Sequence, residues 1–166
     1  MIDLDTARVL FEYTDWSTHE LVSCSLNLSD EQLDRDMQVG PGSLRRIFIH
    51  IYNGESVWLK RWQGNLETRW PSESEPTPVK DLLERFEREW LERDRFLTLL
   101  PPADLVVPQN YRDSKGSVYR ATLGNMVMQT IMHTKHHQAQ ACNVLKRLGA
   151  RWPELDYMMR VRQAVV

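Results

Sequence analysis

The sequence feature that most constrains the fold is the stretch from residue 123 to residue 148, which has the pattern of one long amphipathic helix. Thr122 can cap its first turn, and Gly149 follows its last turn as a stop. Residues at intervals of three and four form one stripe of this helix: Met126, Thr130, His133, His137, Gln140, Val144 and Leu148. The stripe therefore predicts that His133 and His137 face the interior of the protein.

Three other segments repeat the helical period of apolar residues. The spacing predicts helices over residues 4–25, 43–63 and 78–100, the last of them capped by Thr77 with Pro78 in its first turn. Four helices of about twenty residues predict an all-α fold, a four-helix bundle about 30 Å long. The 166 residues, 1–166, are expected to form a single domain of this kind.

Long connectors join the predicted helices, and they can cover one end of the bundle. A short capped helical turn is expected at residues 29–33, and another from Asp156. Residues 103–121 contain two β-like runs, at 105–107 and 117–119, separated by the turn-forming residues 113–116. This pattern favours a small hairpin or an extended loop before the last helix.

Composition excludes several classes of partner. The formal net charge is −2, with 27% charged and 42% hydrophobic residues, so the charge offers no attraction to nucleic acid or to a membrane surface. The first residues lack the pattern of a secretory signal, and no apolar run is long enough to span a bilayer. Cys24 and Cys142 are far apart, so we expect reduced thiols and a cytoplasmic location.

The two histidines of the central stripe have two interpretations. Imidazoles four residues apart lie one helical turn apart and can bind one metal ion together. They can also be buried histidines that hydrogen-bond to polar neighbours. The zinc-protease pattern is absent, because Thr134 stands where that pattern has its glutamate.

A third histidine joins them if the bundle forms. His50 lies on the second predicted helix, and Gly54, one turn later, can allow close approach of a ligand or of another helix. Bundle cores build metal sites from facing helices, and three histidines with a position left open are typical of a catalytic metal site. Imidazole suits zinc, nickel, copper and iron, so the ligand type does not fix the metal.

Short motifs along nearly the whole chain carry a family resemblance. The first half contains Tyr13-x-x-Trp16, Leu26-x-Leu28-Ser29-Asp30-Glu31-Gln32-Leu33, Gly42-Ser43-Leu44, His50-Ile51 and Glu55-x-x-Trp58-x-x-Arg61-Trp62. The second half contains Tyr111, Gly116, His133-x-x-x-His137 with Gln140, Leu148-Gly149 and Asp156. In order and spacing, these motifs resemble the DinB/YfiT-like family of metal-binding four-helix-bundle proteins.

The resemblance implies a divalent metal ion bound by His50, His133 and His137. Some members of this family are thiol-dependent transferases that join a low-molecular-weight bacterial thiol to electrophiles, and others are associated with DNA damage or stress. The sequence departs from the family at Thr18 and around residues 136–140, and these departures spare the three ligands.

Neighbouring residues have a functional and a structural interpretation each. Gln129 and Gln140 can orient an imidazole or can be amides of the bundle core. Glu55 can act as a general base or as a carboxylate beside the ligands, or it can be an exposed surface residue. His136 is expected on the surface. Three aromatic residues can wall a pocket over the metal or belong to the core: Trp58, Trp62 and Tyr111.

We therefore expect a metal-dependent enzyme that acts on a small molecule, with zinc or nickel as the divalent ion. The resemblance favours a thiol S-transferase, with a low-molecular-weight thiol as co-substrate. A metal-dependent hydrolase is the alternative among enzymes. A non-catalytic metal-binding stress protein, acting as a homodimer, is the alternative outside them.

Overall fold

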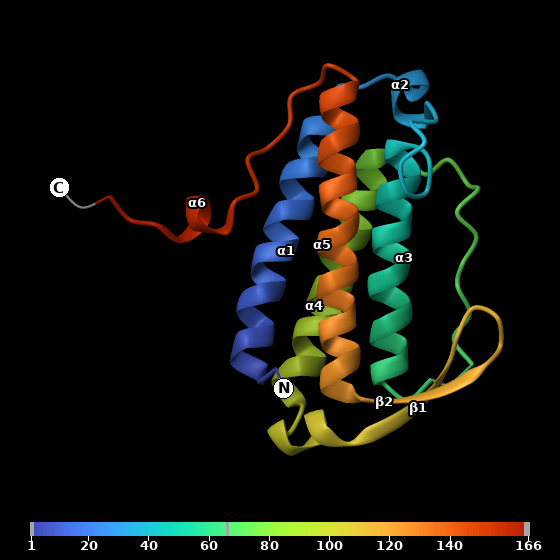
Figure 1. Ribbon diagram of the computed structural model, residues 1–166, viewed down its shortest axis with the longest axis vertical. Coiled ribbons are helices and arrows are strands. Elements are labelled where there is room, and N and C mark those ends of the chain that lie inside the picture. The colour runs from blue at the N-terminus through green and yellow to red at the C-terminus, as the bar shows by residue number, and fades with distance from the viewer. Residues whose placement is uncertain (1, 66, 165–166) are drawn as a thin grey trace.

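A computed structural model of the chain describes residues 2–65 and 67–164. Its body is a bundle of four long helices (Figure 1). They are α1 (Leu4–Ser25), α3 (Leu44–Trp62), α4 (Val79–Leu99) and α5 (Leu123–Arg147). The all-α four-helix bundle expected from the sequence is confirmed, with helix bounds within one or two residues of those predicted.

The order and directions of the helices differ from those of an up-down-up-down bundle. α5 packs between α1 and α3, and α4 packs against α1 and α3 on the opposite side. In Figure 1, α1 and α5 run in one direction, whereas α3 and α4 run in the other. Because α3 and α4 are parallel neighbours, the connector at residues 63–78 must return along the full length of the bundle.

Short elements cover the two ends of the bundle. At one end is α2 (Asp30–Asp34), which begins with the predicted capping box between Ser29 and Gln32. At the other end are a 3-10 helix, η1 (Pro102–Val106), and an antiparallel hairpin of β1 (Pro108–Arg112) and β2 (Val118–Thr122). The hairpin was predicted, but its bounds differ from the β-like runs.

The run at residues 105–107 was wrongly predicted to be β-like. Pro102 has no N–H to donate, which suits the first turn of a helix, and η1 forms there instead. Thr77 was likewise predicted to cap α4, but the cap residue is Pro78, with no side-chain hydrogen bond. The carbonyl of Thr77 instead accepts a hydrogen bond from Arg45 at 3.0 Å.

The bundle interior consists of two apolar clusters with polar side chains between them. One cluster fills the α2 end and includes Phe48 and Phe86, and the other fills the hairpin end and includes Phe11 and Trp62. We call a group of buried and partly buried polar side chains between them the polar layer, and it consists of Asp15, Glu55, Arg93, Thr134 and Gln138.

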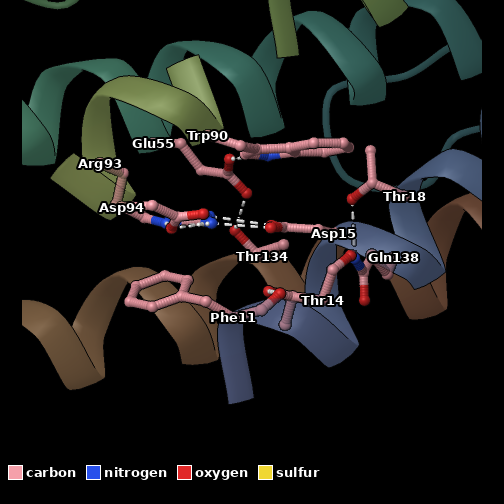
Figure 2. Close-up of polar contacts among 10 residues, drawn as sticks. All are labelled: Phe11, Thr14, Asp15, Thr18, Glu55, Trp90, Arg93, Asp94, Thr134 and Gln138. Atoms are coloured by element: carbon pink, nitrogen blue, oxygen red, sulfur yellow. Dashed lines mark hydrogen bonds and ion pairs between the residues drawn. The ribbon is translucent and has the colours of Figure 1, made fainter. Parts of the chain in front are cut away.

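All four long helices contribute to the polar layer (Figure 2). Arg93 of α4 makes two hydrogen bonds to Asp15 of α1, at 2.8 and 2.7 Å. Glu55 of α3 accepts hydrogen bonds from Thr134 of α5 and Trp90 of α4. Buried polar groups are stable only when they are hydrogen-bonded, so this layer fixes the mutual positions of the four helices.

The chain after α5 continues outside the four helices and packs beside α1. Gly149 ends α5 with a φ of 69°, and the following segment carries the short α6 (Tyr157–Val161), capped by Asp156 as predicted. This segment contacts α1, because Tyr13 donates a hydrogen bond to the carbonyl of Leu155 and its ring packs against Tyr157 with centroids 5.2 Å apart. Among the described residues, no helix is both long and apolar enough to cross a membrane.

Candidate metal centre

Three histidines from two facing helices meet in the groove between α3 and α5. His50 comes from α3, whereas His133 and His137 come from successive turns of α5. One ring nitrogen from each lies within 4.8 Å of those of the other two. The Nε2 atoms of His50 and His133 are 3.1 Å apart. The structure therefore brings together the three histidines singled out from the sequence, and we call them the three-histidine cluster.

A glycine makes room for this cluster. Gly54 lies on α3, one turn after His50, and faces the ring of His133. A β-carbon built at Gly54 would lie 2.5 Å from Cε1 and 2.7 Å from Nδ1 of His133. Any larger residue would therefore have to displace the ring, which explains a glycine in the middle of a helix despite its unfavourable helix propensity.

The outer nitrogen of His50 is held by the connector at residues 63–78. Oε1 of Glu73 lies 2.7 Å from Nδ1 of His50 and also accepts a hydrogen bond from Trp70 Nε1 at 2.6 Å. A carboxylate only accepts hydrogen bonds here, so Nδ1 of His50 carries the proton and its Nε2 presents a lone pair. The ring of Trp70 packs against His50 with centroids 4.8 Å apart.

A glutamine holds His137 in the same way. Oε1 of Gln140 lies 2.7 Å from Nδ1 of His137, so this nitrogen is also the donor. The amide nitrogen of Gln140 is 3.0 Å from Nε2 of His136, whose exposed ring accepts its hydrogen bond. Gly40, at φ 54°, leaves the space that the Gln140 side chain occupies. Of the two interpretations of Gln140, the orienting one fits these contacts.

The environment disfavours protonation of two members of the cluster, His133 and His137. Burial, followed by the nearby His137 and His50, lowers the pKa of His133 to about 3. Burial also lowers the pKa of His137, although its hydrogen bond to Gln140 opposes the shift. Burial would raise the pKa of Glu73, but the hydrogen bonds from His50 and Trp70 outweigh it, and the net pKa is lowered. His133 and His137 are therefore neutral at pH 7, and the carboxylate of Glu73 is ionised.

This donor set fits a divalent transition-type ion. Two of the imidazoles have their tautomers fixed by outer hydrogen bonds, so their Nε2 atoms carry the lone pairs that a metal ion would bind. Nitrogen ligands about 2.0–2.1 Å from one ion lie roughly 3–3.5 Å from each other, close to the 3.1 Å between His50 and His133. Three neutral nitrogen donors are typical of zinc, nickel, copper and iron sites.

A pocket of about 540 Å³ opens beside the three-histidine cluster. His133 lines one part of it, and we call it the aromatic pocket because Trp58, Trp70 and Tyr111 form much of its wall. Trp58 and Tyr111 pack against each other with centroids 5.3 Å apart, whereas Trp62 lies in the core. Another hollow, of about 640 Å³ between α2 and the connector, has no histidine in its lining.

The sequence of this chain matches the model of a known protein family. The model of the DinB family matches residues 1–164. The chain belongs to the DinB family. The family resemblance stated from the sequence motifs is thereby confirmed. A search of curated proteins gave no match.

Two solved structures resemble this DinB-family chain. A DinB-like protein from Bacillus cereus is 19% identical, with a TM-score of 0.73 over 92% of this chain and 97% of that one. YfiT from Bacillus subtilis, described as a probable metal-dependent hydrolase with an unusual four-helix bundle topology, is 16% identical. Its TM-score is 0.64, and the match covers 92% of each chain. These likenesses support the fold.

The structure also shows where three other residues of this DinB-family protein lie, namely Glu55, Gln129 and His136. Glu55 is neither exposed nor beside the histidines: it is 4% exposed and belongs to the polar layer (Figure 2). Burial, followed by the charge of Asp15, raises the pKa of Glu55 to about 7, against the opposing effect of Arg93. Gln129 is exposed and lines the aromatic pocket. His136 is on the surface, as predicted.

Two residues of the site were missed from the sequence. Glu73 and Trp70 belong to the polar connector, which has no periodicity that would predict where it runs. Trp70 was the available signal, because a large aromatic side chain in a polar loop tends to pack against something. The parallel arrangement of α3 and α4 brings this loop past His50. No motif in the sequence predicts that arrangement.

Proposed function

We propose that this protein is a divalent-metal-dependent thiol S-transferase, with zinc or nickel held by His50, His133 and His137. The observation that carries the proposal is the three-histidine cluster at the edge of the aromatic pocket. Three protein donors leave a position for a substrate atom, which is typical of catalytic metal sites. A divalent ion supplies the chemistry by lowering the pKa of a coordinated thiol or water, so a nucleophile exists at neutral pH.

The residues around the cluster support transfer from a thiol. Glu73 and Gln140 hold the imidazoles of His50 and His137 in fixed orientations. Among the described residues, the aromatic pocket has one carboxylate in its lining, Asp113, and this accepts hydrogen bonds from the backbone of the hairpin turn. Water attack benefits from a general base, whereas a thiol with a lowered pKa needs none.

The proposed reaction balances without a further reactant. The thiol sulfur forms a bond to an electrophilic carbon, and the bond from that carbon to its leaving group breaks. The leaving group departs as an anion, and the thiol proton passes to solvent. The aromatic walls formed by Trp58, Trp70 and Tyr111 can hold an apolar electrophile near the cluster and keep bulk water away.

Replacement of the metal by cobalt gives a direct test. Addition of a small thiol to the cobalt protein should produce a thiolate-to-cobalt absorption band, and the zinc protein should accelerate conjugation of the thiol to an activated aryl chloride. The matched control is His136→Ala, which should keep both responses, whereas His133→Ala should lose both. A cobalt spectrum that no thiol changes would refute the transferase.

A metal-dependent hydrolase is the second candidate, and the description of YfiT favours it. The same zinc protein separates the two candidates when it is assayed with ester and amide substrates in the absence of thiol. Chelator-sensitive hydrolysis without any thiol effect would favour the hydrolase. Stoichiometric zinc with neither activity would favour a metal-binding protein without turnover.

A further inference from the structure

The aromatic pocket contains a buried arginine that forms no ion pair with any described residue. Arg61 of α3 is 6% exposed, and its guanidinium lies over the rings of Trp58 and Tyr111, 4.6 and 5.2 Å from their centroids. Its Nη2 donates to the backbone carbonyl of Arg112 at 2.8 Å. Its Nε has no hydrogen-bond partner among the described residues.

The other two buried arginines are paired with carboxylates, which makes Arg61 exceptional. Arg93 makes ion pairs with Asp15 and with its neighbour Asp94. Arg45 makes ion pairs with Asp34, at 2.7 Å, and with Asp30. Among the described residues, no carboxylate lies within ion-pair distance of Arg61. A buried charge without an ionic partner is destabilising, so such residues concentrate where a ligand supplies the partner.

Burial disfavours the charged form of the Arg61 side chain. Burial lowers its pKa, and the nearby Tyr111 and Asp113 only partly oppose that effect. Asp113 belongs to the hairpin turn, where its Oδ1 accepts from the backbone N–H of Lys115 and Ser117. An arginine stays protonated at neutral pH even so. The pocket therefore contains a cation that its own residues leave incompletely neutralised.

Arg61 and the three-histidine cluster share this pocket. Arg61 and His133 both line it. Along α3, Arg61 is seven residues beyond Gly54, which touches His133, and seven residues of helix span about 10 Å. One small molecule can therefore reach from the cluster to Arg61 if its two functional ends are separated by a chain of several atoms.

We propose that Arg61 binds a carboxylate of the substrate, so that the thiol acted on is an acid whose sulfur reaches the three-histidine cluster. The guanidinium has a planar fork of N–H groups that matches the two oxygens of a carboxylate. Trp58 and Tyr111 pack against this guanidinium, and one of its terminal nitrogens donates to Arg112, whereas no hydrogen bond is formed by the other, Nη1, among the described residues. This inference rests on the proposed thiol function for the identity of the other end of the ligand.

A matched pair of thiols tests the proposal. Mercaptohexanoate and mercaptohexanol have the same chain and differ in a carboxylate against an uncharged hydroxyl. Binding to the zinc protein is measured by calorimetry and by the fluorescence of Trp58 and Trp70. We expect the acid to bind the wild type at least tenfold more tightly. Arg61→Met, which keeps the apolar stem and removes the charge, should abolish this preference and leave binding of the alcohol unchanged.

The control variant is Arg120→Met, because Arg120 lies in the same hairpin end but is exposed and bonds to Asn110. It should keep the full preference for the acid. A preference that survives Arg61→Met, or acid and alcohol that bind the wild type equally, would overturn the proposal. If Arg61→Met does not fold, Arg61→Lys replaces it and should lower the preference, because an ammonium lacks the fork.

The metal-free protein separates this proposal from the thiol function. With chelator present, hexanoate should still bind more tightly than hexanol, because Arg61 does not depend on the ion. Binding of hexanoate without any thiol effect on the zinc protein would leave Arg61 as an anion site and refute the transferase. Equal binding of hexanoate and hexanol, with normal zinc content, would refute the role of Arg61 alone.

Discussion

Replacing Gly54 with alanine would test how closely α3 and the His133 ring are fitted. The new β-carbon would lie 2.5 Å from Cε1 of His133, so the ring or a helix has to move. Overpacking of this kind destabilises a protein by about 1–3 kcal/mol, whereas alanine for glycine inside a helix stabilises it by about 1 kcal/mol. In metal-free protein we expect a net loss of about 0–2 kcal/mol.

A double-mutant cycle tests whether the effect of Gly54→Ala on stability comes from contact with the His133 ring. In a His133→Ala background the ring is absent, so Gly54→Ala should raise the free energy of unfolding by about 1 kcal/mol. Urea denaturation followed by circular dichroism, with chelator present, measures all four proteins. The same effect of Gly54→Ala in both backgrounds would refute the proposed contact with the ring.

The same substitution also reports on the proposed metal site. A displaced His133 ring presents its Nε2 poorly, so Gly54→Ala should weaken zinc binding by about 10–100-fold, the usual effect of disturbing the residues that orient a ligand. Calorimetric titration of zinc into the apoprotein measures this. Unchanged zinc affinity in a folded Gly54→Ala protein would show that His133 is not held against α3 in the bound state.

Three further changes have defined outcomes. Elemental analysis should show that His50→Ala loses most of its zinc while His136→Ala keeps it, and equal retention would exclude His50 as a ligand. Glu73→Gln keeps an acceptor for His50 but removes the charge, so zinc affinity should fall about tenfold by calorimetry. The pKa of Glu55 is raised to about 7, so the folded state binds its proton more tightly than the unfolded state does, and the stability it contributes is lost as pH rises from about 4.5 to 7. Relative to wild type, Glu55→Gln should therefore gain on the order of 3 kcal/mol over that range, measured by urea denaturation, and a constant difference would show that Glu55 does not titrate there.

Helical periodicity and caps were enough to predict the bundle. The stripe through His133 and His137, the capping box at Ser29 and the stop at Gly149 each encode local geometry, and local geometry depends on neighbours in the sequence. The interpretation of Gly54 as a point of close approach also rested on local spacing, and the His133 ring lies against it. Zinc or nickel, the thiol and the homodimer stay predictions.

The errors at the functional residues came from contacts between segments that are distant in the sequence. Glu55 looks exposed in the sequence because it is an acidic residue on a helix, yet Thr134 and Trp90 come from two other helices to bond with it. Arg61 occurs in a motif of the family resemblance, but the lack of a hydrogen-bond partner for its Nε among the described residues depends on everything packed around it. Glu73 was missed for the same reason, since a loop has no periodicity that says what it lies against.

The connector at residues 63–78 has a thermodynamic consequence for the ion. Its described residues form no helix or strand, yet Glu73 and Trp70 hold the imidazole of His50. The coupling between metal binding and loop ordering is reciprocal. The free energy by which the ordered connector strengthens metal binding therefore equals the free energy by which the bound metal ion stabilises the ordered connector. Amide hydrogens of this loop should therefore exchange more slowly in zinc-loaded protein, and the ratio of exchange rates measures how much of the binding energy is spent on ordering a segment that the helices leave free.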